Sequence, residues 1–274
     1  MGHFFGPNLG RGKHAEWLSK GYALKQDALS GLKQAFDRLG LCPRGLSSFD
    51  IDANNLAAST LRFSDQSTLQ VAQIERLIPC FTSGAIIATP RGGVPVETLK
   101  SGDRVITRDN GIQTLTWVGK KRLDHVQLQA LEALRPIHIA AGALGNNHPE
   151  TDMLVSPAHR MLIVSDLARL HFGQAEVLVA AKDLCDLPGV SVSEKPYVTY
   201  HHFMCETHEL VLGDGAWSES FQPADFSIKG LDAAQREELF ALFPELETKA
   251  GIKAYQAARA TISRQEARMF VSGK

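Results

Sequence analysis

The chain has 274 residues, and its 29 Lys and Arg residues against 30 Asp and Glu residues leave a formal net charge of −1. Its hydrophobic content of 44% and charged content of 22% are ordinary for a globular protein with a packed core. The balanced charge, without any basic block, argues against nucleic acid as a partner. No run of about eighteen apolar residues occurs, so we expect neither a membrane-spanning helix nor a membrane partner.

The N-terminus and the cysteines bear on where the chain resides. Gly and Pro interrupt residues 1–18, whereas a signal peptide needs an unbroken apolar core. The cysteines are irregularly spaced and form no C-x-x-C pair: Cys42, Cys80, Cys185 and Cys205. Neither a disulfide framework nor a zinc ribbon is indicated. These features predict a cytoplasmic location, or export by a route that does not use an N-terminal signal peptide, and no cofactor.

Residues 1–77 differ from the rest of the chain in their pattern of apolar and polar residues. Apolar residues between about 14 and 40 recur at spacings of three to five, which predicts one or two helices. A polar stretch with turn residues follows, up to about residue 73. We interpret residues 1–77 as a partly helical N-terminal segment, either a leader or a cargo.

Residues 78–221 consist of short apolar runs separated by Gly and Pro, which is typical of an antiparallel all-β module. Asn110-Gly111 predicts a tight hairpin within 105–118, because both residues tolerate the positive φ angles that such turns require. Gly213-Asp214-Gly215 predicts a second hairpin. Further strands are expected at 86–88, 136–140, 153–156, 161–165, 176–180 and 198–204, with a strand pair in 94–107 around the turn 100–103.

Residues 222–274 return to a helical pattern. Asp232 and Gln235 have the spacing of a capping box, and the helix that follows should end before Pro244. A second helix is expected from Ile252 to about Phe270. The chain is therefore predicted to be mainly β, with a helical N-terminal segment and a helical C-terminal extension.

The most specific stretch begins at Cys80. A cysteine, a small-residue turn and an apolar run occupy residues 80–90, and residues 96–105 then follow the pattern V-x-x-L-x-x-G-D-x-V. This order resembles the opening block of the Hedgehog/intein (Hint) superfamily, and it looks closest to a bacterial Hint subgroup. The resemblance extends over about 78–221 and implies the all-β Hint fold and an autoprocessing activity.

The resemblance also implies particular roles. Cys80 matches the nucleophile that attacks the preceding carbonyl in an intramolecular N–S acyl shift, which gives a thioester and cleaves the Pro79–Cys80 bond. An amide nitrogen is a poor leaving group, so an acid must protonate it. In Hint domains this acid is the His of a Thr/Ser-x-x-His motif, which His159 matches, with Ser156 as the supporting hydroxyl. Asp152 either orients His159 or deprotonates Cys80, or it is an exposed strand-end residue.

Residues 208–220 resemble the closing block, with His208 in its upstream histidine position. Inteins end this block in His-Asn, where the Asn cyclises to complete splicing, but Glu219 and Ser220 stand here and neither forms a succinimide. Cleavage without splicing is therefore expected. The partners are then the chain's own N-terminal segment, as intramolecular substrate, and an unknown nucleophile that resolves the thioester. The ring of Pro79 crowds the carbonyl under attack, which should slow the reaction.

Two other interpretations remain open. The first is a non-catalytic Hint-fold module with a structural or interaction role. The second is a metal-dependent hydrolase built on a cluster of four side chains: His201, His202, Cys205 and His208. Strand alternation separates Cys205 from His202 and His208, and the spacing does not match a zinc site, so the sequence favours this interpretation least.

Overall fold

The computed structural model describes strands at 46–50, 60–63 and 68–70, and then residues 78–130, 132–224, 227–228 and 231–271. The helices expected between about 14 and 40 lie outside these residues. Contacts divide the chain into two compact units, 1–75 with 126–132, and 76–125 with 133–274. We describe each unit by itself. No helix among the described residues is long and apolar enough to cross a membrane.

The first unit contains an antiparallel sheet with strand order β1–β2–β3. Its strands are β1 (Leu46–Asp50), β2 (Thr60–Phe63) and β3 (Thr68–Gln70). Most of helix α3 (His125–Ala130) belongs to this unit, and the short 3-10 helix η4 (Glu132–Leu134) follows it in the chain.

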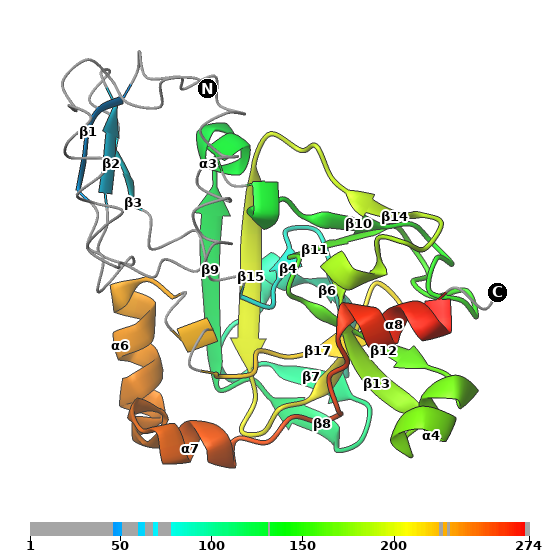
Figure 1. Cartoon of the computed structure of the whole chain (residues 1–274). Helices are drawn as coiled ribbons and strands as arrows, with labels where there is room; N and C mark the ends of the chain where they lie inside the picture. Colours follow the sequence, from blue (N-terminus) through cyan, green and yellow to red (C-terminus); the bar gives the residue numbers. More distant parts are fainter. Residues whose placement is uncertain are drawn as a thin grey trace. The chain divides into compact units, whose positions relative to one another are not determined.

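The second unit contains a six-stranded antiparallel sheet with the order β14–β10–β11–β4–β15–β9. Its strands are β14 (Val190–Val192), β10 (Ile137–Ile139), β11 (Met153–Val155), β4 (Phe81–Thr82), β15 (Val198–Met204) and β9 (Trp117–Leu123). Figure 1 shows β9 and β15 as two long neighbouring strands, and they pair along their whole length. The short strand β4 pairs with β15 on one side and β11 on the other, so the residue before it lies between two strands.

The other eight strands of this unit pair in the order β13–β12–β17–β16–β5–β6, with β7 joined to β16 and β8. They are β13 (Glu176–Ala180), β12 (Arg160–Val164), β17 (Ala216–Glu219), β16 (Leu210–Gly213), β5 (Ile86–Thr89), β6 (Gly92–Pro95), β7 (Arg104–Thr107) and β8 (Gly111–Thr114). Both predicted hairpins are confirmed, as β7–β8 and β16–β17. Asp214 and Gly215 have φ angles of 49° and 76°, which a two-residue hairpin turn of this kind requires.

The pairing expected within 94–107 is wrong in one respect. Strands β6 and β7 both form, but β6 pairs with β5 and β7 pairs with β8 and β16. The reason is the short helix η3 (Val96–Thr98), which follows β6 and buries Val96 in the core. The chain therefore leaves the β5–β6 pair before the turn at 100–103, and β7 pairs with β8 and β16 instead of with β6.

The C-terminal extension belongs to the second unit. Its elements are α6 (Ala233–Leu242), η6 (Pro244–Glu247), α7 (Lys249–Ala254) and α8 (Arg264–Val271). The continuous helix expected over 252–270 is wrong, because residues 255–263 are not helical. In this break the Leu178 backbone bonds Ala260 and Ile262, and the Ile262 side chain is buried. Pairing with β13 outweighs local helix propensity there.

Two shorter helices complete the second unit, α4 (Asp166–Phe172) and η5 (Ala181–Leu184). Figure 1 shows α8 beside β13, which it contacts together with η5. The main core cluster lies between the strands and includes Phe81, whose ring stacks on Phe203 with centroids 5.5 Å apart. Gly213 allows this packing, because a Cβ there would meet the Phe81 ring at 2.6 Å.

We expect Gly213→Ala to lower the free energy of unfolding by about 1–3 kcal/mol, since the added methyl group overpacks a buried ring. Gly93→Ala is the matched control. A Cβ at Gly93 would also meet a neighbour at 2.6 Å, but that neighbour is the Cγ2 methyl group of Ile86, whose exposed side chain can change rotamer. Urea unfolding measures both variants. Equal losses of stability would contradict this account of the core.

Candidate functional site

Cys80 is buried immediately before β4. Because Tyr200 pairs with Thr82 and His201 with Phe81, the register places His202 opposite Cys80. The Cys80 Sγ lies 3.3 Å from the His202 Nδ1. Burial raises the pKa of the thiol, while Lys121 and the Ser156 hydroxyl act to lower it. The resting group is thus a protonated thiol beside an imidazole.

Ser156 holds the backbone on both sides of Pro79. Its hydroxyl accepts the Cys80 N–H at 2.9 Å and donates to the Ile78 carbonyl at 2.6 Å. Its own N–H donates to the Cys80 carbonyl at 2.9 Å. Ser156 of the predicted motif therefore lies next to the predicted nucleophile, because β11 ends beside β4. The three bonds fix the peptide that would be cleaved.

His202 occupies a tightly shaped site. Its ring stacks on Trp117 with centroids 5.1 Å apart and contacts Phe221 at 5.8 Å. Gly119 is its register partner on β9, and a Cβ there would lie 2.3 Å from the His202 Nε2. Burial lowers the pKa of His202 to about 4, so the imidazole is neutral near pH 7. Gln235 from α6 lies on its far side, with Oε1 at 3.1 Å from Nε2.

His159 is buried against the Phe81 ring, with ring centroids 4.5 Å apart. Among the described residues, neither of its ring nitrogens has a hydrogen-bond partner. Burial lowers the pKa of His159 to about 4, and Arg160 and His208 act in the same direction, against the opposing effect of Glu219. An unpartnered buried imidazole costs stability, which is a feature expected of functional rather than structural histidines.

Glu219 is fully buried in an ionic cluster. Arg160 bonds its carboxylate through the backbone N–H and Nε, both at 2.8 Å, and the His208 Nε2 lies 3.2 Å away. Burial acts to raise the pKa of Glu219, but Arg160 and His208 outweigh it and lower the pKa to about 2. The His208 Nδ1 accepts the Ala258 N–H at 2.9 Å, which ties the C-terminal extension to the cluster. Ser220 is also buried, and its hydroxyl accepts the Glu209 N–H.

The structure does not bring Asp152 to the thiol or to His159. Its carboxylate accepts the Ala141 N–H at 2.9 Å and pairs with the His138 Nε2 at 3.1 Å. These contacts, first the backbone bond and then the His138 bond, lower the pKa of Asp152. Its side chain is 64% exposed, as the strand-end interpretation expects.

The histidines of the metal-site interpretation point to different partners. His201 bonds the Ser83 hydroxyl at 2.8 Å, His202 contacts the Cys80 thiol, and His208 contacts Glu219. Within the described ranges, no group of three His, Cys, Asp or Glu side chains could hold a metal ion.

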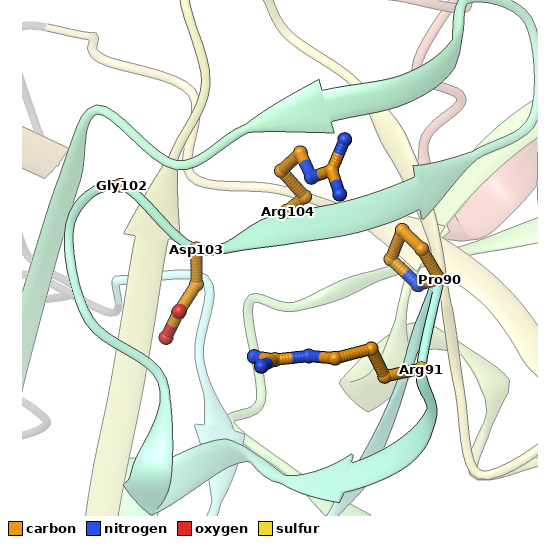
Figure 2. A pocket seen from close by; sticks show the side chains of 5 residues that line it. All are labelled: Pro90, Arg91, Gly102, Asp103 and Arg104. Carbon is orange, nitrogen blue, oxygen red and sulfur yellow. The ribbon is translucent and has the colours of Figure 1, made fainter.

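A pocket elsewhere on the second unit is lined by Pro90, Arg91, Gly102, Asp103 and Arg104 (Figure 2). These residues come from the β5–β6 turn and from the turn that leads into β7. The residues that surround Cys80 do not line this pocket.

Comparison with known proteins gives the family. The model of the Hint domain family matches residues 79–225, more than half of the chain. The chain belongs to the Hint domain family, an autoprocessing-type family with the mainly β fold described above. The comparison with curated proteins found no match.

Similar solved structures include a bacterial intein-like domain from Clostridium thermocellum, at 16% identity, with 52% of this chain and 97% of that one covered and a TM-score of 0.32. The AceL NrdHF class 3 split intein is also 16% identical, covering 54% and 97%, with a TM-score of 0.34. The Ssp DnaB mini-intein variant M86 is 11% identical, covering 55% and 98%, with a TM-score of 0.34. The family assignment rests on the family model alone.

Two residues of the site were not identified from the sequence. The sequence suggests His202 only as part of a metal cluster, because its position opposite Cys80 is visible only once the strand register is known. Gln235 was interpreted as a helix cap. The sequence around Gln235 does not indicate its contacts with β9 and β15, because both contacts depend on how the C-terminal extension packs.

The buried histidines make stability depend on pH. His159 and His202 have pKa values of about 4 in the folded protein, against 6.5 ordinarily. The unfolded chain therefore binds more protons between about pH 6.5 and 4, so stability should fall as pH falls through this range, by up to about 3 kcal/mol per histidine. Urea unfolding at several pH values measures this. His159→Phe should weaken the dependence without lowering stability at pH 7; a pH-independent wild type would contradict the burial of both rings.

Removal of the Glu219 carboxylate should destabilise the buried ionic cluster. We expect Glu219→Ala to lower the free energy of unfolding by about 3–5 kcal/mol, because it leaves the Arg160 charge buried without its partner. Glu176→Ala is the comparison variant. Glu176 also binds arginines, but at the surface, where ion pairs contribute about 0–1 kcal/mol. Similar melting temperatures for the two variants would contradict this assignment.

Proposed function

We propose that this Hint domain cleaves its own chain at the Pro79–Cys80 bond, without splicing. The Cys80 sulfur attacks the Pro79 carbonyl carbon, an S–C bond forms and the C–N bond to Cys80 breaks. The proton lost by the thiol is matched by the proton that the freed Cys80 nitrogen gains. The product is a thioester between residue 79 and the Cys80 side chain. Water or another nucleophile then releases residues 1–79.

The observation that carries this proposal is the bond from the Cys80 N–H to the Ser156 hydroxyl, beside a thiol that faces His202. The nitrogen in that bond is the one that must leave. Because the hydroxyl also bonds the Ile78 carbonyl, both flanks of Pro79 are held while the carbonyl reacts. Such positioning lowers the entropic part of the barrier.

His159 supplies the acid in this proposal. In the part of the chain that the structure describes, its ring nitrogens have no hydrogen-bond partner, and the proposal assigns one of them to the leaving nitrogen during the reaction. Because its pKa is about 4, the imidazole is mostly neutral at pH 7, so charging it contributes to the barrier. A slow, single-turnover reaction is consistent with this cost and with the crowding by Pro79.

The C-terminal junction is not cleaved in this proposal. Splicing needs an asparagine side chain that cyclises, and the corresponding residues are Glu219, bound in the ionic cluster, and Ser220, bonded to the backbone of Glu209. Neither side chain attacks its own carbonyl to form a succinimide. One cut and two fragments are expected, residues 1–79 and a fragment that begins with Cys80.

The test is intact mass of the full chain during incubation with hydroxylamine or dithiothreitol. We expect the wild type to yield a fragment that begins at Cys80, at a rate that rises with the added nucleophile, because both reagents open a thioester. Cys80→Ala should yield none. Cys205→Ala is the matched control, since Cys205 is equally buried but has its backbone carbonyl, not its thiol, in a described bond.

Cleavage in both cysteine variants would point to a contaminating protease. An unchanged wild-type mass over several days would overturn the proposal. It would favour the interpretation of the chain as a non-catalytic Hint-fold module with a structural or interaction role. The raised pKa of the buried Cys80 thiol is the observation on the side of that interpretation.

A further inference from the structure

The orientation of the Gln235 amide is determined by its neighbours. Its Nε2 donates to the Lys120 carbonyl at 2.6 Å and to the Asp232 carboxylate at 2.9 Å, and both of these groups only accept. The Oε1 must therefore be the atom that faces the His202 Nε2, at 3.1 Å. Exchanging the two amide atoms would place oxygen against two other oxygens.

This orientation fixes the tautomer of His202. The amide oxygen only accepts, so the His202 Nε2 must carry a hydrogen. A neutral imidazole has one N–H, so the Nδ1 keeps its lone pair and accepts the Cys80 S–H at 3.3 Å. The ring is held in this orientation between Trp117 and Phe221, over Gly119.

Gln235 occupies the third position of α6, where a capping-box glutamine bonds back to the backbone N–H of the N-cap residue, here Asp232. The Asp232 side chain does accept the Gln235 N–H at 2.9 Å, as the sequence predicted. The Gln235 side chain, however, reaches across to β9 and β15. The Gln235 side chain therefore bonds both the N-cap residue of its own helix and groups at the thiol site.

We infer that Gln235 is a positioning residue that holds His202 as the proton acceptor for Cys80, which makes helix α6 part of the autoprocessing site although it follows the segment matched by the family model. This inference rests on the proposed function, because it assigns the destination of the thiol proton. The proton moves from Sγ to Nδ1, the thiolate attacks the Pro79 carbonyl, and the Nε2–H stays bonded to Gln235. The partly buried Lys121 ammonium favours the resulting thiolate.

Three variants test the inference in the full chain by cleavage rate over a range of pH. Gln235→Met keeps the length of the side chain and removes the acceptor. We expect cleavage to slow at least about tenfold, because the variant loses part of the roughly 10²–10⁴-fold effect of a positioned acid or base. Gln235→Glu keeps an acceptor for the His202 Nε2 but removes the donor to the Lys120 carbonyl and the Asp232 carboxylate, so its rate should lie between those of the wild type and Gln235→Met. Its negative charge favours protonated His202, so the loss of rate on acidification should begin at higher pH than in the wild type. Glu237→Met, at an exposed position of the same helix, is the control and should match the wild type.

A second measurement does not depend on cleavage. Nitrogen-15 chemical shifts of labelled histidine report the tautomer, and the wild type should show His202 with its hydrogen on Nε2. Gln235→Met should show a mixture of tautomers, while thermal melting reports whether the variant is folded. These spectra are recorded on Cys80→Ala as well, so that cleavage does not change the sample.

The outcomes separate the two proposals. If the wild type does not cleave, the proposed function fails, and the histidine spectra still decide the tautomer. If the wild type cleaves and Gln235→Met has an unchanged rate and pH profile, the inference fails alone. A wild-type His202 with its hydrogen on Nδ1 would also overturn it.

Discussion

The site depends on the placement of one short strand. Strand β4 pairs with β11 on one side and β15 on the other, so the residue before it meets a polar side chain from each neighbour. Ser156 reaches the Cys80 nitrogen from one side, and His202 reaches its sulfur from the other. Because both contacts follow from backbone pairing, a shift of the register by one residue would remove them together.

Burial has two opposing effects in this arrangement. It keeps the Cys80 thiol protonated and the two imidazoles neutral, so the resting site carries little charge. It also strengthens every electrostatic interaction once a proton moves. The adjacent Glu219–Arg160 pair is compensated internally and stays ionised, as the low pKa of Glu219 indicates. The protein thus separates a charged structural cluster from a neutral reactive one within the same core.

The sequence predicted those parts that have local signals. The Asn110-Gly111 signal predicted the hairpin, in which Gly111 has a positive φ angle of 66°, and the resemblance of Ser156–His159 to the Hint Ser-x-x-His motif implied Ser156. The contact of His202 with Cys80 joins residues 122 positions apart, so only the sheet register reveals it. The break at Ile262 was missed for a similar reason, since its backbone pairs with Leu178, far away in the chain.

The contribution of Gln235 has a consequence for timing during protein synthesis. Gln235 follows Cys80 by more than a hundred residues, so a growing chain carries the thiol long before it carries the amide. Until α6 has been made and has docked, nothing in the described contacts of His202 fixes its tautomer. In the proposed reaction, a nascent chain would therefore cleave more slowly until translation has passed α6.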